Sequence, residues 1–420
     1  MKRVLMIAYH FPPMAAGSGF QRTLRFAEYL PDSGWLPSVL TVHPRAYPGR
    51  APEPAAGDGA PPDGRAPRVR RAFSLDAARH LSLFGRYPQW LGTPDRWWSW
   101  WLGAVPAGLA MIRELKPDVL WSTFPIATAH AIGHTLHRIT GIPWVADFRD
   151  PMAQDGYPPE PAVHRAFERI ERKTMAHCAR AVFTTRGTLR LYAGRYPDLP
   201  PERLVVIENG YDEAAFAAAE ALPGDGAAQA RRNGPLVLVH SGTVYASERD
   251  PRPFFAALAD LKARGRVGPQ TLKVVLRATG CDEYLRGLLR PLGIIDMVML
   301  APPVGYRAAL AEMLAADGLL VLQAANCNDQ VPAKLYEYLR ARRPILAFTD
   351  TAGDTARTLA DAGIDTIAPL DSEARIAEQL IRFLALVRDG RAPVADAPRI
   401  AAASRRSRTV ELARQLEAVS

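Results

Sequence analysis

Short apolar runs alternate along the chain with stretches in which apolar residues recur every three or four positions. The runs at 3–8, 119–123, 144–148 and 236–240 are almost continuously apolar, which is typical of parallel strands buried on both faces. Helical spacing follows the first run, where Phe20, Leu24 and Ala27 share one face. The alternation of strand and helix predicts an α/β protein with doubly wound parallel sheets.

The same patterns predict the remaining elements. We expect further strands at 38–42, 181–184, 204–207, 273–278, 298–300, 319–323, 344–349 and 366–369, and helices near 105–115, 253–263, 284–291, 306–315 and 400–419. A chain of 420 residues is too long for one ordinary core and predicts two domains of roughly 200 residues.

The domain boundaries follow from composition. We expect a first Rossmann-like domain over 1–207, a linker over 208–234 and a second Rossmann-like domain over 235–394, with 395–420 as a final helix. Residues 44–68 contain seven prolines and four glycines with little periodicity, so we interpret them as a flexible loop.

The positive charge of the chain is confined to its first half. The net charge is +9, and residues 1–206 hold 26 Lys and Arg against 17 Asp and Glu, which accounts for all of it. This asymmetry fits an anionic membrane surface or an anionic acceptor, and it equally fits an arginine-rich composition. No motif of the usual nucleic-acid-binding modules is present, so we expect no nucleic-acid partner.

Cysteine and histidine usage favours an intracellular protein without a metal site. The three cysteines, Cys178, Cys281 and Cys327, are odd in number and lack metal-ligand spacing, which argues against a disulfide framework. Histidines at 130, 134 and 137 lie on one helical face without an acidic ligand, so a metal site there is the weaker alternative. The apolar run 4–8 is shorter than a secretory core, and no run reaches the ~18 residues of a membrane span. We expect a cytoplasmic protein.

Five of the eight tryptophans fall between Trp90 and Trp101. Tryptophan packs well in a core, and it also lies at membrane interfaces or stacks on sugars and lipids. Core packing explains most of the cluster, and a lipid-facing role for one or two members remains the alternative.

The segment 332–346 carries the most specific chemistry. Pro332 suits the start of a helix, and Lys334 then falls in the first turn, where a cation is electrostatically misplaced. An anion docked at the helix N-terminus would explain this lysine. Glu337 lies one turn deeper on the same side and can accept hydrogen bonds from a sugar diol. The alternative is an ordinary surface Lys–Glu pair.

Other polar groups also follow predicted strands, where doubly wound sheets bind ligands. Gly17, Ser18 and Gly19 permit close backbone approach to a ligand, or simply form a tight turn. Arg249 can grip phosphate bidentately unless Glu248 and Asp250 neutralise it.

The cluster of Asp147, Arg149 and Asp150 ends a further predicted strand. It can position an acceptor hydroxyl, or it can form a structural salt-bridge cluster.

Six motifs, taken in order, resemble the family-4-type retaining glycosyltransferases of GT-B fold. They are Tyr9-His10-Phe11-Pro12-Pro13 with Gly17 to Thr23, Gly34-Trp35, Ala146 to Pro151, Ile207 to Asp212, Ser241 to Tyr245, and Pro332 to Leu339 with Arg343 to Leu346. The similarity runs over most of the chain. It implies two Rossmann-like domains facing a cleft, with the last helix crossing back to the first domain.

The resemblance also implies roles for individual residues. Lys334 and Arg249 hold the donor diphosphate, Glu337 binds the ribose diol, and Asp147 replaces the acceptor-side histidine of many relatives. The family often has two glutamates seven residues apart; Glu337 matches the second, but Asp329 stands at the first, so the donor-sugar contact passes in part to Asn328 or Gln330. Gly17, Ser18, Gly19, Gly242 and Thr243 complete the expected donor site, and Arg22, Arg149 and Asp150 the acceptor side.

The resulting hypothesis is a retaining, metal-independent glycosyltransferase. It uses a nucleotide sugar as co-substrate, needs no cofactor, and acts on a polysaccharide, lipid-linked or metabolite acceptor, in the cytoplasm or peripherally on the inner face of the cytoplasmic membrane. Two alternatives share the architecture: a nucleotide-sugar epimerase, and a non-catalytic scaffold.

Overall fold

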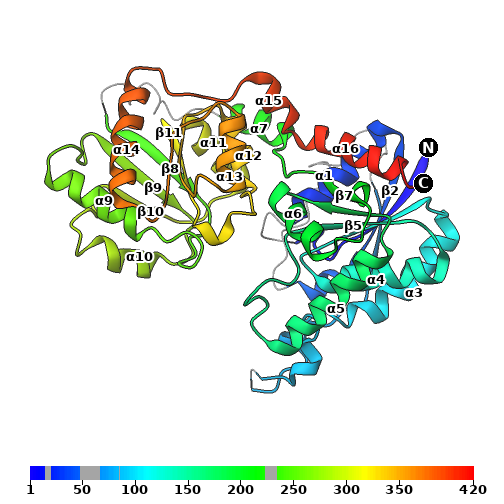
Figure 1. Cartoon of the computed structure of the whole chain (residues 1–420). Helices are drawn as coiled ribbons and strands as arrows, with labels where there is room; N and C mark the ends of the chain where they lie inside the picture. Colours follow the sequence, from blue (N-terminus) through cyan, green and yellow to red (C-terminus); the bar gives the residue numbers. More distant parts are fainter. Residues whose placement is uncertain (15–19, 48–66, 85, 223–233) are drawn as a thin grey trace. The chain divides into compact units, whose positions relative to one another are not determined.

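The computed structural model describes residues 1–14, 20–47, 67–84, 86–222 and 234–420. The chain divides into two compact units: Met1–Asn209 with Arg405–Ser420 form unit 1, and Gly210–Ser404 form unit 2. Figure 1 shows that each unit is a parallel sheet with helices on both faces. Gly17, Ser18 and Gly19 and most of the predicted flexible loop, 48–66, lie outside the described residues.

Unit 1 is built on a seven-stranded parallel sheet in the order β3-β2-β1-β4-β5-β6-β7. The strand order reverses between β1 and β4, so the loops that follow these two strands diverge and leave a crevice at their carboxyl ends. The strands are β1 (Lys2–Ile7), β2 (Trp35–Val42), β3 (Arg68–Ala72), β4 (Val119–Thr123), β5 (Trp144–Arg149), β6 (Arg180–Phe183) and β7 (Leu204–Val206).

Helices cover both faces of this sheet. One face packs against α3 (Trp100–Leu115), α4 (Ala127–Thr140), α5 (Pro161–His177) and α6 (Arg186–Arg195). The other packs against α1 (Gln21–Tyr29) and α16 (Arg405–Glu417), so the last helix of the chain buries Leu412 and Leu416 in the core of unit 1. The shorter elements are α2 (Ala77–His80) and the 3₁₀ turns η2 (Leu30–Ser33), η3 (Pro44–Ala46), η4 (Gln89–Gly92) and η5 (Pro201–Arg203).

Unit 2 has a six-stranded parallel sheet in the order β10-β9-β8-β11-β12-β13, whose reversal falls between β8 and β11. Its strands are β8 (Leu236–Ser241), β9 (Leu272–Arg277), β10 (Val298–Ala301), β11 (Gly318–Leu322), β12 (Ile345–Phe348) and β13 (Ile367–Ala368). Figure 1 shows α9 (Arg252–Ala263), α10 (Asp282–Leu289) and α14 (Glu373–Arg388) on one face. The other face carries α7 (Glu213–Glu220), α11 (Tyr306–Ala315), α12 (Lys334–Ala341), α13 (Asp354–Asp361) and α15 (Ala397–Ala402).

Three local expectations need correction. The segment predicted as a linker contains α7, which Asp212 caps by accepting a hydrogen bond from the Ala215 N–H and which buries Phe216 in unit 2. The predicted final helix is two helices, α15 and α16, because the helical backbone is interrupted at Ala403 and Ser404. The strand β3 was not anticipated, since its arginine-rich sequence lies at a sheet edge and buries only Ala72 well.

The tryptophan cluster separates into core and surface residues. Trp100 is fully buried and Trp97 packs against the same core, whereas Trp90 is exposed. Trp98 donates a hydrogen bond from Nε1 to the Leu91 carbonyl, and Trp101 donates one to Thr135 Oγ1. Core packing therefore explains part of the cluster, but not Trp90.

Over the described ranges, no helix is both long enough and apolar enough to cross a bilayer.

The contact between α4 and β5 gives a stability prediction. A Cβ at Gly133 would lie 2.8 Å from the indole of the buried Trp144, so we expect Gly133→Ala to lower the free energy of unfolding by about 1–3 kcal/mol through overpacking. Gly194 in α6 has no atom within 4 Å of the same position, and Gly194→Ala should stabilise by up to about 1 kcal/mol. Denaturant unfolding of both variants tests this, and equal effects would contradict it.

Candidate functional site

The reversal of strand order in unit 2 places two loops at one crevice. β8 ends at Ser241 and is followed by Gly242 and Thr243, and the loop from Gln323 to Ala333 follows β11 and leads into α12. Ligands of doubly wound sheets bind at this position. The sequence-predicted donor residues of the second half lie on these two loops, on α12 and on the loop that holds Arg249.

Lys334 is the first residue of α12, and its ammonium reaches back to the end of β8. Its Nζ lies 3.1 Å from His240 Nε2 and 3.2 Å from where a Cβ on Gly242 would stand. Gly242 has φ +115°, a conformation that side-chain-bearing residues rarely adopt. Glycine is therefore required here for two reasons: the backbone turn and the room for the lysine.

The electrostatics of Lys334 are unusual. Burial and the nearby positive charge of Arg249 lower its pKa to about 7, and Glu337 opposes this shift. A lysine with this pKa is about half charged at neutral pH, so a nearby anion can change its protonation state.

His240 fixes the geometry around this lysine. The imidazole is fully buried at the end of β8, and Nδ1 lies 2.9 Å from the Leu320 carbonyl of the neighbouring strand. Because a carbonyl can only accept, Nδ1 carries the proton and Nε2 is left to accept from Lys334. Burial, followed by the charge of Lys334, keeps the pKa of His240 well below its usual value, so the ring stays neutral.

Arg249 supplies a second positive charge beside Lys334. Its guanidinium donates to the Thr243 carbonyl at 2.6 Å and stacks on the Tyr245 ring, 5.3 Å from the centroid. Asp250 does not neutralise Arg249, because it binds Arg252 through both carboxylate oxygens. Within the part of unit 2 that the structure describes, neither Arg249 nor Lys334 forms an ion pair.

Glu337 lies one turn further along α12. Its Oε1 accepts a 2.8 Å hydrogen bond from the Tyr306 hydroxyl, which projects from the first residue of α11. The next residue, Tyr338, is buried and accepts from the Ser241 N–H, which ties α12 to the end of β8. The side chain of Glu337 is only partly buried and remains close enough to raise the pKa of Lys334.

The loop between β11 and α12 is held by a buried glutamine. Gln323 Nε2 donates to the carbonyls of Cys327 and Gln330, at 2.9 and 3.0 Å. Asn328 donates to Asp350 at 2.6 Å, while its Oδ1 is buried without a hydrogen-bond partner among the described residues. Asp329 is exposed at the top of this loop. Asn328 therefore has one buried polar atom to offer a ligand.

In unit 1, Arg22 and Asp147 form a buried bidentate ion pair. Arg22 Nε and Nη2 donate to the two carboxylate oxygens at 3.0 and 2.9 Å, and Thr123 donates to Oδ2 at 2.9 Å. Arg22 also donates to the carbonyls of Ile207 and Glu208. Both side chains are almost completely buried, so this geometry favours a structural role. The catalytic role of Asp147 and the acceptor-side role of Arg22 stay predictions.

A small pocket lies at the strand-order reversal of unit 1. Tyr9 and His10 after β1, Thr23 on α1, Thr123 at the end of β4 and Arg149 at the end of β5 contribute to its lining. Hydrogen-bond partners are absent, among the described residues, for Tyr9 Oη, His10 Nδ1 and Thr23 Oγ1, although all three atoms are buried. Burial and then the charge of Arg149 lower the pKa of His10 to about 4, so this ring is neutral.

Arg149 has φ +60°, a rare conformation for a residue with a side chain, and such strain concentrates at functional sites. The adjacent Asp150 is exposed. The acceptor-side roles of both residues stay predictions.

Of the histidines of α4, His130 is buried in unit 1, whereas His134 and His137 are partly exposed. His130 is buried with Nδ1 2.8 Å from Ser122 Oγ, and burial lowers its pKa to about 3. The His134 and His177 rings contact each other at 4.9 Å. Across the described ranges, no three His, Cys, Asp or Glu side chains are arranged to hold a metal ion.

Sequence reasoning missed four groups that the structure brings to these sites: His10, His240, Tyr306 and Gln323. His240 carried a readable signal, because it is the single ionisable residue at the end of an apolar strand and directly precedes Ser241-Gly242-Thr243. Tyr306 carried none, since only the folding of α11 beside α12 brings it to Glu337.

Comparison with known families agrees with the motifs read from the sequence. Residues 19–210 match the model of the glycosyl transferase 4-like domain. This stretch, just under half of the chain, is therefore similar to the glycosyl transferase 4-like domain. No curated protein matched the sequence.

Solved structures with the same fold span the whole chain. Sucrose-phosphate synthase from Thermosynechococcus elongatus is 16% identical, with a TM-score of 0.65 and 100% of both chains covered. Anabaena HepE in complex with UDP and glucose is 13% identical, with a TM-score of 0.64 and the same coverage. The α,α-trehalose 6-phosphate synthase from Burkholderia multivorans is 14% identical, with a TM-score of 0.65, covering 100% of this chain and 97% of the other. The predicted GT-B fold is confirmed.

The ion pair in unit 1 yields a prediction that separates structure from catalysis. Arg22→Met leaves the buried carboxylate of Asp147 without its counter-charge, and we expect the free energy of unfolding of unit 1 to fall by about 3–5 kcal/mol. Arg375→Ala breaks an exposed pair with Glu378 and should cost less than about 1 kcal/mol. Denaturant unfolding measures both, and an unchanged stability in Arg22→Met would show that the pair is not structural.

The pKa of Lys334 can be measured directly. Reductive ¹³C-methylation followed by NMR titration should show one lysine titrating near pH 7, far below the usual value of about 10.4. In His240→Phe the ammonium loses its neutral hydrogen-bond acceptor, so the pKa should fall further. Lys262, which binds Asp296, is the internal control. A Lys334 resonance that titrates together with the surface lysines would contradict the site's electrostatics.

Proposed function

We propose that the protein is a retaining glycosyltransferase that uses a nucleotide-sugar donor. The observation that carries the proposal is the pair of cations, Lys334 and Arg249, which meet without an ion-pair partner among the described residues at the strand-order reversal of unit 2. The negative charge of a donor diphosphate would relieve their mutual repulsion.

The donor would lie along α12 and the loop before it. Lys334 and Arg249 bind the diphosphate, with the N-terminus of α12 adding to the attraction. Glu337, held by Tyr306 at 2.8 Å, accepts hydrogen bonds from the ribose diol. Asn328 Oδ1 and the exposed Asp329 are the groups offered to the donor sugar. Since the structure of HepE with UDP and glucose has the same fold, UDP-glucose is the first probe.

Catalysis on this proposal is charge stabilisation of the departing diphosphate. Lys334 takes up a proton from solvent when the donor diphosphate binds, and Lys334 and Arg249 then stabilise the negative charge that develops on the departing diphosphate. These two cations do the work that a metal ion would otherwise do, so we propose a metal-independent reaction without a cofactor. The leaving diphosphate accepts the proton of the acceptor hydroxyl on the same face of the sugar, which retains its anomeric configuration.

Unit 1 would hold the acceptor. We propose that the atoms of Tyr9, His10 and Thr23 that lack partners among the described residues bind acceptor hydroxyls, with the neutral His10 ring able both to donate and to accept a hydrogen bond. The acceptor class we propose is a polysaccharide, a lipid-linked oligosaccharide or a small metabolite. In this scheme Asp147 acts through Arg22 as a positioning group.

We further propose that the protein works in the cytoplasm and attaches peripherally to the inner face of the cytoplasmic membrane. None of the three cysteines forms a disulfide within the described residues, which suits a reducing compartment. The charge excess of residues 1–206 suits an anionic lipid surface.

Nucleotide binding tests the donor site. Among UDP, GDP, dTDP and ADP and their sugars, one base should raise the melting temperature, because a ligand that binds only the folded state stabilises it. Lys334→Ala should weaken that binding by about 10–100-fold, and Glu337→Gln by about tenfold. The matched controls, Lys262→Ala and Glu283→Gln, change residues on α9 and α10 and should bind normally. No shift with any nucleotide at millimolar concentration favours the scaffold alternative.

Stereochemistry tests the reaction. With the donor that binds, slow hydrolysis in the absence of acceptor should first release the sugar in the donor's own anomeric form, as seen by NMR before mutarotation. Release of the opposite anomer would contradict retention. Conversion of the donor into an isomeric sugar nucleotide would instead identify an epimerase.

A further inference from the structure

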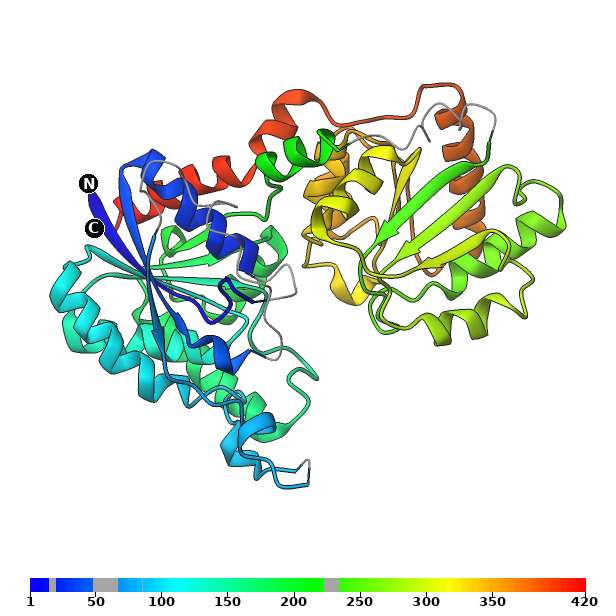
Figure 2. The ribbon, with the colours of Figure 1, turned by 180° about the vertical axis from the view of Figure 1, so that it is seen from behind.

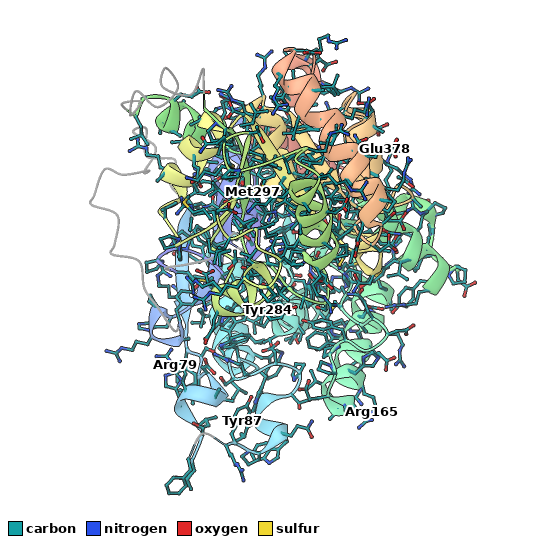
Figure 3. The ribbon with its side chains drawn as sticks, turned by 90° about the vertical axis from the view of Figure 1, so that its left-hand side faces the viewer. Arg79, Tyr87, Arg165, Tyr284, Met297 and Glu378 are labelled. Atoms are coloured by element: carbon teal, nitrogen blue, oxygen red, sulfur yellow. The ribbon has the colours of Figure 1, made fainter. Side chains whose placement is uncertain are left out.

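One segment of unit 1 exposes large apolar side chains without covering the sheet. We call the described residues 77–84 and 86–92, from α2 through η4, the tip segment. It projects away from the sheet beyond α5, as the views from front and back both show (Figures 1 and 2). In Figure 3, Arg79 marks its root on α2 and Tyr87 its projecting end.

The projecting end presents its apolar side chains to solvent. Phe84 is 96% exposed, Leu83 73% and Trp90 69%. Leu83 and Arg86 exchange two backbone hydrogen bonds of 2.8 and 3.0 Å, which fold the end back on itself. Phe84 has φ +51°, a conformation that is rare for an aromatic residue. A clustered, outward-facing set of this kind usually marks an interaction site.

The root of the tip segment is firmly tied to the core of unit 1. The fully buried Asp76 caps α2 by accepting from the Ala78 N–H, and it binds Arg96 at 2.6 Å. Asp95 accepts two hydrogen bonds from Thr128 on α4. The exposed residues are therefore carried by an anchored projection, and their exposure is not the fraying of a loose end.

The tip segment carries positively charged side chains and no negatively charged ones. Between residues 77 and 94 there is no Asp or Glu, whereas Arg79, His80 and Arg86 are present and Arg86 is exposed. The acidic groups at its root, Asp76 and Asp95, are turned inward to Arg96 and Thr128. Apolar side chains at an extremity, flanked by arginines with no exposed carboxylate, match the boundary between anionic headgroups and acyl chains.

We propose that the tip segment inserts Leu83, Phe84 and Trp90 into the surface of an anionic lipid bilayer, with Arg86 against the headgroups. This inference names the surface for the membrane attachment in the proposed function, but it does not depend on sugar transfer. A bilayer accepts a narrow apolar projection, whereas a stable protein interface needs roughly 800 Å² per partner. Arg86 can bind the phosphate of a lipid headgroup or a free phosphate ion by the same chemistry, so the test compares vesicles with soluble phosphate.

Cosedimentation of the full chain with vesicles tests the proposal. We expect binding to equimolar phosphatidylglycerol and phosphatidylcholine at low salt, and weaker binding at high salt or to phosphatidylcholine alone. Phe84→Ser with Trp90→Ser should reduce binding by at least about tenfold. The control, Ile139→Ser with Ile295→Ser, removes two exposed apolar residues elsewhere and should bind normally. Arg86→Glu should weaken binding, and Arg388→Glu should not.

A second readout reports insertion itself. Lipids brominated on their acyl chains should quench part of the tryptophan fluorescence, and Trp90→Phe should remove most of that quenching. Melting temperatures of all variants show whether they are folded. Absence of wild-type binding at low salt, equal binding by the Phe84/Trp90 variant, or full competition by inorganic phosphate each overturns the proposal. Self-association that the same variant abolishes would assign the surface to a second copy and overturn it as well. None of these results affects the nucleotide-binding test.

Discussion

A buried lysine that lies beside a second positive charge is the feature on which the rest of this site depends. Burial, and after it the positive charge of Arg249, lowers the pKa of Lys334 to about 7, and in the described residues no carboxylate forms an ion pair with either side chain. A protein keeps such an arrangement when a ligand supplies the missing charge. On the proposed function, the diphosphate of a nucleotide sugar is that anion, in keeping with the match of residues 19–210 to the glycosyl transferase 4-like domain.

The fold explains why these charges meet. In a parallel sheet the carboxyl ends of all the strands lie on the same side. The reversal of strand order between β8 and β11 leaves a crevice on that side. Three neighbouring features then fix the lysine: the neutral imidazole of His240, the absent side chain of Gly242, and the hydroxyl of Tyr338 bound to the Ser241 N–H. The carboxyl ends of the strands in unit 1 also carry a buried cation, Arg22, but this one is already paired with the carboxylate of Asp147. Arg22 therefore links α1 to β5 and to the end of β7.

Much of this was predictable, and the exceptions have physical causes. Buried strands such as β4 and β8 can be predicted from their apolar runs. Lys334 could be predicted as a site residue because a cation is unfavourable in the first turn of a helix. Periodicity could not reveal β3, whose arginines face outward, or the break between α15 and α16. Contacts between distant segments, such as Tyr306 with Glu337 or Asp147 with Arg22, depend on tertiary packing that no local pattern encodes. Exposure of Phe84 and Trp90, beside the buried Trp100, is likewise a tertiary property.

Proton uptake on ligand binding tests the central claim most directly. Calorimetric titration at pH 8 with the nucleotide sugar that binds, in two buffers of different ionisation enthalpy, counts the protons exchanged. A Lys334 that is mostly neutral at this pH must regain its proton beside a diphosphate. The account predicts uptake of close to one proton per site, abolished in Lys334→Arg. Tight binding without proton uptake would contradict it, because Lys334 would then not be the group that meets the donor's charge.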